Sequence, residues 1–226
     1  MESYRSEPEY AAAMQTYLTG DREESRKVIE TLLKKNPDDP TLLLLLGNIK
    51  YTLGLLGESA AHYERAIQVD PGFCQAYFKL GVCYVRMGKL NEALRAFRKN
   101  LESGCSGHTM SHYWIGLINN FLGNDDEALE AFTILHRESK ESQLANFFLA
   151  QLLMKRNRHA EALVLLNDLL TLTPDFAEVH FLIGQAYAGQ YRTMEAIQSF
   201  RKTLELNPSD KRAQLIIEQY TGDSPH

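Results

Sequence analysis

The feature that most constrains this chain is a sequence period of 34 residues. One copy is clearest at residues 76–102, where apolar residues recur at helical spacing before and after a break at Gly88. This pattern predicts two helices joined by a tight turn, that is, a helical hairpin. A single hairpin has an apolar face on each helix and too little partner surface to bury both. It therefore needs neighbours of the same shape.

Four positions of the period carry the same kind of residue in most copies. With Cys74 as position 1, position 8 is small and gives Gly47, Gly81, Ala150 and Gly184. Position 20 is also small and gives Ser25, Ser59, Ala93, Ala128, Ala162 and Ala196. Position 24 is large and apolar and gives Ile29, Tyr63, Phe97, Phe132, Leu166 and Phe200. Position 32 gives Pro37, Pro71, Pro174 and Pro208.

This pattern resembles the tetratricopeptide repeat (TPR) family, which has a small residue at position 8, alanine at 20, an aromatic residue at 24 and proline at 32. The resemblance covers six units, at residues 6–39, 40–73, 74–107, 109–142, 143–176 and 177–210. It implies an all-α fold, a right-handed α-solenoid of helix-turn-helix hairpins that forms one domain over residues 1–226. Residues 211–220 are expected to close the array as a capping helix, with Ala213, Ile216, Ile217 and Tyr220 on its apolar stripe.

Several local signals agree with this arrangement. Ser6 and Glu9 have the spacing of a capping box at the start of the first helix. Asp21, Asn124 and Asp210 are candidate N-caps of later helices. The five consecutive leucines at 42–46 predict a helix that packs on both flanks rather than one that contacts lipid.

Composition excludes several classes of function. The chain has 226 residues and a formal net charge of −5, which argues against a general nucleic-acid binder. Its longest aliphatic run, 42–46, is far below the roughly 20 residues needed to span a bilayer. Residues 1–9 do not resemble a signal peptide, and three cysteines are an odd number. We therefore expect reduced thiols and a cytoplasmic location.

The resemblance also implies where a partner would bind. In this family the first helices of successive units line a concave groove, with positions 2, 5, 9, 12 and 13 facing into it. Applied to this sequence, and with the single tryptophan at position 6 added, this rule selects a ring-rich set of groove residues. They are Tyr10, Met14, Tyr17, Asn48, Tyr51, Phe78, Val82, Arg86, Tyr113, Trp114, Leu117, Asn120, Phe121, Phe147, Gln151, Lys155, Phe181 and Gln185.

A groove this apolar predicts a protein–protein interaction adaptor or scaffold that binds an apolar or amphipathic peptide segment. The structural alternative is that the aromatic residues at position 5 are partly used in packing between adjacent first helices. A different class of function is a structural subunit of a larger assembly, such as secretion, pilus or envelope machinery, joined through self-association or its terminal helices. A monomer is expected for the adaptor, and a homo-oligomer is the alternative.

Other chemistries find little support. A TPR subclass binds acidic chaperone tails through a carboxylate clamp at positions 2, 5, 6 and 9, of which only Asn48 and Lys79 offer fragments here. There is no Gly-rich phosphate loop, H-E-x-x-H or G-x-S-x-G motif, so we expect no enzyme and no cofactor. The basic turn at 154–159 is interpreted as solvated.

Residues 103–108 break the repeat pattern. The segment carries a one-residue insertion and two glycines, and it predicts a looser junction or a changed superhelical angle between the third and fourth units. Cys105, His108 and His112 have spacing compatible with zinc, but no fourth ligand is evident nearby. The favoured interpretation is a polar loop, with no metal.

Overall fold

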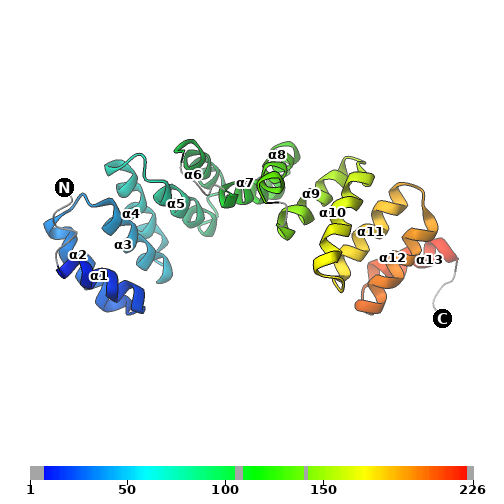
Figure 1. The fold of residues 1–226 in the computed structure, drawn as a ribbon, viewed down its shortest axis with the longest axis horizontal. Coiled ribbons are helices and arrows are strands. Elements are labelled where there is room, and N and C mark those ends of the chain that lie inside the picture. The colour runs from blue at the N-terminus through cyan, green and yellow to red at the C-terminus, as the bar shows by residue number, and fades with distance from the viewer. Residues whose placement is uncertain (1–7, 105–108, 140–141, 223–226) are drawn as a thin grey trace. The chain divides into compact units, whose positions relative to one another are not determined.

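The computed structural model describes residues 8–104, 109–139 and 142–222. Over these residues the chain forms thirteen α-helices and no strand (Figure 1), which confirms the expected all-α class. The helices are α1 (Pro8–Thr19), α2 (Arg22–Lys35), α3 (Pro40–Thr52), α4 (Leu56–Val69), α5 (Cys74–Arg86), α6 (Leu90–Glu102), α7 (Thr109–Leu122), α8 (Asp125–Glu138), α9 (Gln143–Lys155), α10 (His159–Leu172), α11 (Ala177–Gly189), α12 (Thr193–Leu206) and α13 (Lys211–Thr221).

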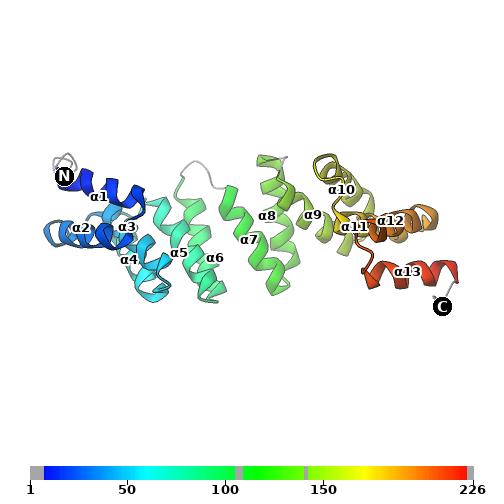
Figure 2. The same cartoon turned by 90° about the horizontal axis from the view of Figure 1, so that it is seen from below.

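The first twelve helices fall two to a repeat. Each of the six expected units holds one pair, and a thirteenth helix follows at the predicted capping position. Consecutive helices contact one another from α1 to α6 and from α8 to α13, as in α3 with α4 and α4 with α5, and Figures 1 and 2 show such pairs side by side. The chain divides into two compact units, Met1–Ile118 and Asn119–His226, and each is described by itself below.

Close contact between positions 8 and 24 fixes the hairpins. A Cβ atom added to Gly81 would lie 2.7 Å from the ring of Phe97, and one added to Gly47 would lie 2.6 Å from Tyr63. Phe97 is fully buried and Tyr63 is 1% exposed. The small residue therefore lets a large ring of the second helix lie directly on the backbone of the first helix. This explains the sequence pattern that revealed the repeat.

The five leucines at 42–46 are all buried, with exposed fractions between 0% and 8%. They divide between two core clusters, because Leu43 and Leu44 pack toward α4 and α5 while Leu42 and Leu45 pack toward α1 and α2. Neighbours on both flanks leave this helix only a small solvent-facing surface for polar residues. The prediction of a helix packed on both flanks is confirmed.

The capping predictions have mixed outcomes. Asp21 accepts a hydrogen bond from the Glu24 backbone N–H at 3.0 Å, and Asp210 accepts from the Arg212 backbone N–H at 3.0 Å. Asn124 stands at the N-cap of α8, but its side chain makes no cap hydrogen bond and donates instead to Asn119 Oδ1 at 3.1 Å. The Asn124 prediction is therefore wrong for the side chain. Ser6 lies outside the described residues.

The turns inside the hairpins use the left-handed backbone region. Four of the six carry glycine there, with φ between +72° and +85° at 20, 54, 88 and 123. Asn157 and Tyr191 occupy the equivalent positions of the last two hairpins, with φ of 58° and 60°. A tyrosine is uncommon in this region because its Cβ crowds the backbone. Its side chain is 94% exposed, so packing does not hold it there.

Candidate peptide-binding surface

The predicted groove residues lie on α1, α3, α5, α7, α9 and α11, the first helices of the hairpins. Most of them are half-buried, neither sealed in the core nor fully solvated. The half-buried residues are Tyr10, Met14, Tyr17, Asn48, Tyr51, Phe78, Val82, Tyr113, Trp114, Leu117, Asn120, Phe147 and Gln151. Arg86, Phe121, Lys155 and Gln185 are exposed, Phe121 to 80%.

Several of the rings also contribute to packing. Phe78 meets Phe97 edge-on with ring centroids 5.8 Å apart, and Trp114 stacks on Phe97 at 6.1 Å. In the second unit Phe147 stacks on Phe176 at 5.9 Å. Each of these three groove rings therefore packs partly against this chain. The contacts are with Phe97 of α6 and with Phe176 before α11, and not with a neighbouring first helix as the packing alternative had it.

Phe181 departs from the expectation of an accessible groove residue. It is only 4% exposed, its ring lies 5.4 Å from that of Phe200, and the Arg212 guanidinium of α13 sits 4.1 Å above it. Arg212 is held there by Glu178 at 2.6 Å and by Asp210 at 2.7 Å. The capping helix thus covers this end of the face, so Phe181 belongs to the core of the last hairpin.

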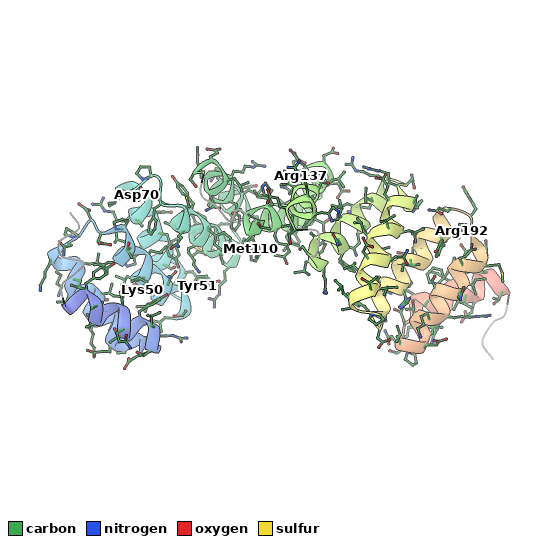
Figure 3. The ribbon with its side chains drawn as sticks, in the orientation of Figure 1. Lys50, Tyr51, Asp70, Met110, Arg137 and Arg192 are labelled. Carbon is green, nitrogen blue, oxygen red and sulfur yellow. The ribbon has the colours of Figure 1, made fainter. Side chains whose placement is uncertain are left out.

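In the Met1–Ile118 unit, four of the predicted residues gather around one hollow of about 250 Å³. Tyr17, Asn48, Tyr51 and Val82 come from α1, α3 and α5, and Figure 3 shows Tyr51 at the end of α3. The remaining lining residues are Thr52, Tyr63 and Lys79. Since sites for small molecules usually measure about 300–1,000 Å³, this hollow suits a single side chain better than a cofactor.

A hydrogen-bond chain crosses the floor of this hollow. The Tyr63 hydroxyl donates to Asn48 Oδ1 at 2.8 Å, and Asn48 Nδ2 donates to the Tyr17 hydroxyl at 3.1 Å. Burial raises the pKa of Tyr63 to about 12, so its phenol remains a hydrogen-bond donor to a higher pH than an ordinary tyrosine would. The chain links α1, α3 and α4, and it fixes the orientation of the Asn48 amide.

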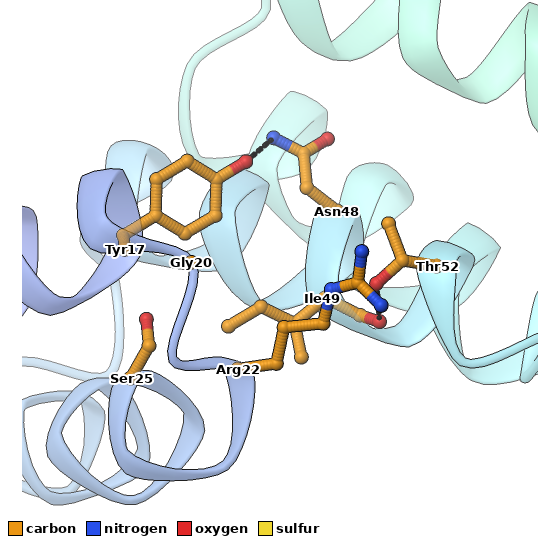
Figure 4. Close-up of a pocket in the computed structure, with 7 residues that line it drawn as sticks. All are labelled: Tyr17, Gly20, Arg22, Ser25, Asn48, Ile49 and Thr52. Carbon is orange, nitrogen blue, oxygen red and sulfur yellow. Dashed lines mark hydrogen bonds between the residues drawn. The ribbon is translucent and has the colours of Figure 1, made fainter.

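A second hollow, of about 230 Å³, adjoins the first and shares Tyr17, Asn48 and Thr52 with it. Figure 4 shows it between the turn of the first hairpin and α3, with Arg22, Ser25 and Ile49 on its walls. The groove positions taken from the sequence omitted Arg22 and Ser25, because both belong to a second helix. The available signal was serine at position 20, where four of the six units have alanine.

The two predicted groove cations are already engaged. The Arg86 guanidinium lies 4.9 Å from the centroid of the Tyr51 ring and donates to the Tyr51 carbonyl at 3.1 Å. Lys155 Nζ lies 3.0 Å from Asp125, and Arg156 pairs with Asp126. The basic turn at 154–159 is thus partly neutralised by the start of α8, consistent with a solvated turn.

The candidate zinc ligands Cys105 and His108 lie outside the described residues, while His112 is half-buried on α7. Within the described ranges, no three His, Cys, Asp or Glu side chains gather as a metal site would require. Cys83 is a buried free thiol. Cys74 is disulfide-bonded, so the expectation of reduced thiols is wrong at that position.

Across the part of the chain that the structure describes, every helix is too short or too polar to traverse a bilayer.

Comparison with known protein families identifies the repeat. Family profiles described as "TPR repeat" or "Tetratricopeptide repeat" match residues 47–88, 123–186, 75–103 and 177–210. These matches cover more than half of the chain, and their boundaries fall in the hairpins described above. The chain is a tetratricopeptide repeat protein.

Solved structures with the same TPR fold resemble it at low sequence identity. The crystal structure of YrrB, described as a TPR protein with an unusual peptide-binding site, superposes with a TM-score of 0.76 at 21% identity. The match covers 84% of this chain and 97% of YrrB. A crystal structure of MamA gives a TM-score of 0.68 at 22% identity and covers 76% of this chain and 94% of MamA.

Among curated relatives, the TPR chain is 27% identical over 161 residues to anaphase-promoting complex subunit 3 of Schizosaccharomyces pombe. That match covers 71% of this chain and 24% of the relative. This chain is also 23% identical to Superkiller complex protein 3 of Mus musculus, in a match that covers 84% of this chain and 15% of the relative. The chain therefore spans a quarter or less of the length of these relatives.

Proposed function

We propose that this TPR protein is a non-catalytic adaptor or scaffold that holds an apolar or amphipathic segment of a protein partner against its first helices. The segment lies across α1, α3 and α5 in the Met1–Ile118 unit. The single observation that carries this proposal is the hollow that gathers Tyr17, Asn48, Tyr51 and Val82. Side chains from three different repeats meet there, and each is half-buried and accessible.

The chemistry of the hollow suits a peptide. Aromatic and branched walls bind an apolar side chain, while the Asn48 amide and the Lys79 ammonium are polar groups in the same lining. The face is built on packed helices, so the binding surface is already formed and little ordering cost falls on this chain. YrrB, which shares the fold, is described as having an unusual peptide-binding site, which adds support by analogy.

The surrounding charges point to a protein partner. The formal net charge of −5 is opposite in sign to that of a general nucleic-acid binder, and the basic turn at 154–159 is paired with carboxylates of α8. We propose that the adaptor acts without nucleic acid and without catalysis.

The test is selection from a random peptide library displayed on phage, using the full chain as bait. Selected peptides are then titrated against wild type, Tyr51→Ala and Val82→Ala. We expect each substitution to weaken binding by about tenfold, as truncation of a buried anchor contact does. The matched control is Val164→Ala, because Val164 is 61% exposed on α10 and lines neither hollow.

Equal affinity of all selected peptides for wild type and both groove variants, with circular dichroism unchanged, would overturn the proposed function. Loss of binding in Val164→Ala alone would move the binding surface to the second unit.

A second candidate function is a structural subunit of a larger assembly. The relatives named above are, by their names, parts of complexes. The capping helix α13 also leaves Leu215 and Tyr220 exposed by 58% and 44%. Light scattering over a wide concentration range separates the two candidates. A monomer throughout favours the adaptor, whereas association that Leu215→Ser abolishes favours the subunit.

A further inference from the structure

The hollow beside Arg22 has an unusual charge for this chain. The two adjoining hollows include two cations among their lining residues, Arg22 and Lys79, and no aspartate or glutamate. The chain as a whole has 29 acidic residues against 24 basic ones. The charged residues that line these two hollows are therefore both cations, although Asp21, Glu23 and Glu24 flank Arg22 in the sequence.

Arg22 is also uncommitted. Arg26, one turn further along α2, forms ion pairs with Glu23 at 2.7 Å and with Glu30 at 3.1 Å. Arg22 has no such carboxylate partner among the described residues. Figure 4 shows its guanidinium extending across the hollow toward Thr52 on α3. The Arg22 guanidinium therefore lies in the hollow.

A second, independent observation comes from Ser25. It is 1% exposed, lines the same hollow, and its Oγ has no hydrogen-bond partner within the described structure. Ser59 occupies the same repeat position one unit later and donates to the Gly47 carbonyl at 2.8 Å. An unpaired buried hydroxyl is costly, and such groups usually find a partner. Figure 4 shows the Ser25 hydroxyl pointing toward the side of the hollow formed by Tyr17.

Tyr17 adds a third donor. Its hydroxyl oxygen accepts from Asn48 Nδ2 at 3.1 Å, which leaves the hydrogen of the phenol directed elsewhere. A guanidinium, a serine hydroxyl and a tyrosine hydroxyl therefore belong to the lining of one hollow, on different sides of it (Figure 4), and no acidic residue is among the lining residues. An oxygen anion bound at the Arg22 guanidinium fits this arrangement.

We propose that this hollow takes the side-chain carboxylate of an aspartate or glutamate in the partner segment. An apolar side chain close to that residue in the segment fills the adjoining hollow of Tyr51 and Val82. The assignment rests on the proposed function and specifies which segment the groove selects. Arg22 and Ser25 are at positions 17 and 20 of the first unit, outside positions 2, 5, 6 and 9 that form the clamp for chaperone tails. The carboxylate site is therefore a different one.

The experiment is a double-mutant cycle on the phage-selected peptides. Each acidic residue of a selected peptide is replaced by its amide, and both peptides are titrated against wild type and Arg22→Gln. In wild type we expect the amide peptide to bind about three- to fivefold more weakly, the range for a partly exposed charge pair. In Arg22→Gln we expect the two peptides to bind equally. The matched control is Arg98→Gln, because Arg98 is exposed on α6 and lines neither hollow.

Two further arms identify the chemistry. Peptides with an amidated C-terminus should bind as well as those with a free one, because the proposed ligand is a side chain. Ser25→Ala should weaken the acidic peptide and leave the amide peptide unchanged, which a purely structural serine would not do. A preference for the free C-terminus would assign the site to a terminal carboxylate and overturn the proposal as stated.

Failure of this proposal differs from failure of the proposed function. Peptides that depend on Tyr51 and Val82 but show the same amide effect in wild type and Arg22→Gln would overturn the carboxylate site and leave the groove intact. Selected peptides that ignore Tyr51 and Val82 altogether would overturn both.

Discussion

At the scale of single residues, the two serines at position 20 show how one side chain can serve different roles. Ser59 donates to the Gly47 carbonyl and closes its own hairpin, whereas Ser25 is buried without a partner beside Arg22. The sequence showed serine at both positions but not the difference between them. The repeat pattern does not encode which of the two hydroxyls finds an acceptor.

This contrast predicts opposite effects on stability. Ser25→Ala should raise the free energy of unfolding by about 1 kcal/mol, because it removes an unpaired buried hydroxyl. Ser59→Ala should lower it by about 1 kcal/mol, because it breaks a buried hydrogen bond. Urea unfolding of the free protein measures both. Equal destabilisation by the two variants would contradict the unpaired state of Ser25.

The glycine at position 8 gives a second residue-scale prediction. Gly81→Ala places a Cβ atom 2.7 Å from the buried Phe97 ring, so it should destabilise by about 1–3 kcal/mol despite alanine's better helix propensity. Gly57→Ala is the matched control, because a Cβ atom there meets nothing within 4 Å. The control should be neutral or stabilise by up to about 1 kcal/mol in the same urea titration. Stabilisation by both substitutions would mean that the Phe97 ring can move away at little cost.

At the scale of helices, the sequence predicted where the helices lie, but it did not predict which of their residues another helix buries. The six pairs, the capping helix and the buried run at 42–46 all follow from periodicity, because packing on both sides demands a fixed spacing of apolar residues. The burial of Phe181 does not follow from that spacing. It depends on Arg212, which lies in another helix and outside the repeat.

The attachment of α13 predicts a pH dependence. Hydrogen bonding from Arg212 holds the pKa of Asp210 below its ordinary value, and the backbone N–H groups of α13 act in the same direction. Because the folded pKa is lowered, the stabilisation is complete above the ordinary aspartate value of about 3.9 and is lost as the pH falls through the lower folded value. Acidification below about pH 3.9 should therefore weaken the capping helix.

The variant that isolates this effect is Asp210→Asn. Asparagine caps helices about as well as aspartate but does not titrate, so the variant should fold and should lose less stability on acidification than wild type. Urea unfolding at neutral and at acidic pH measures the difference. Asp175→Asn, at an exposed site, controls for general charge effects. Identical acid sensitivity in wild type and Asp210→Asn would remove Asp210 as the source.

At the scale of the whole chain, the repeats make stability local. Within each unit, neighbouring hairpins contact one another, so the unfolding free energy of a unit is approximately a sum over its hairpins and the interfaces between them. The sequence predicted the stacking, since the period requires it. It did not predict the division into Met1–Ile118 and Asn119–His226, whose boundary falls inside α7. That a single domain spans residues 1–226 stays a prediction.

Locality can be measured with the single tryptophan. Trp114 stacks on Phe97 within the first unit, so its fluorescence reports on that part of the chain, whereas circular dichroism reports on all helices. Gly81→Ala displaces Phe97 and should shift the fluorescence midpoint in urea by more than the dichroism midpoint. Coincident shifts by the two probes would indicate a single cooperative transition instead.

The left-handed turns carry a consequence for engineering. In the Met1–Ile118 unit all three hairpin turns already have glycine at the residue with positive φ. Substitution there can therefore relieve no further backbone strain. The Asn119–His226 unit still holds Asn157 and Tyr191, and the tyrosine ring gains no burial in return for its backbone conformation. Turn substitutions intended to raise thermal stability should therefore be made in the C-terminal half, first by replacing Tyr191 with glycine.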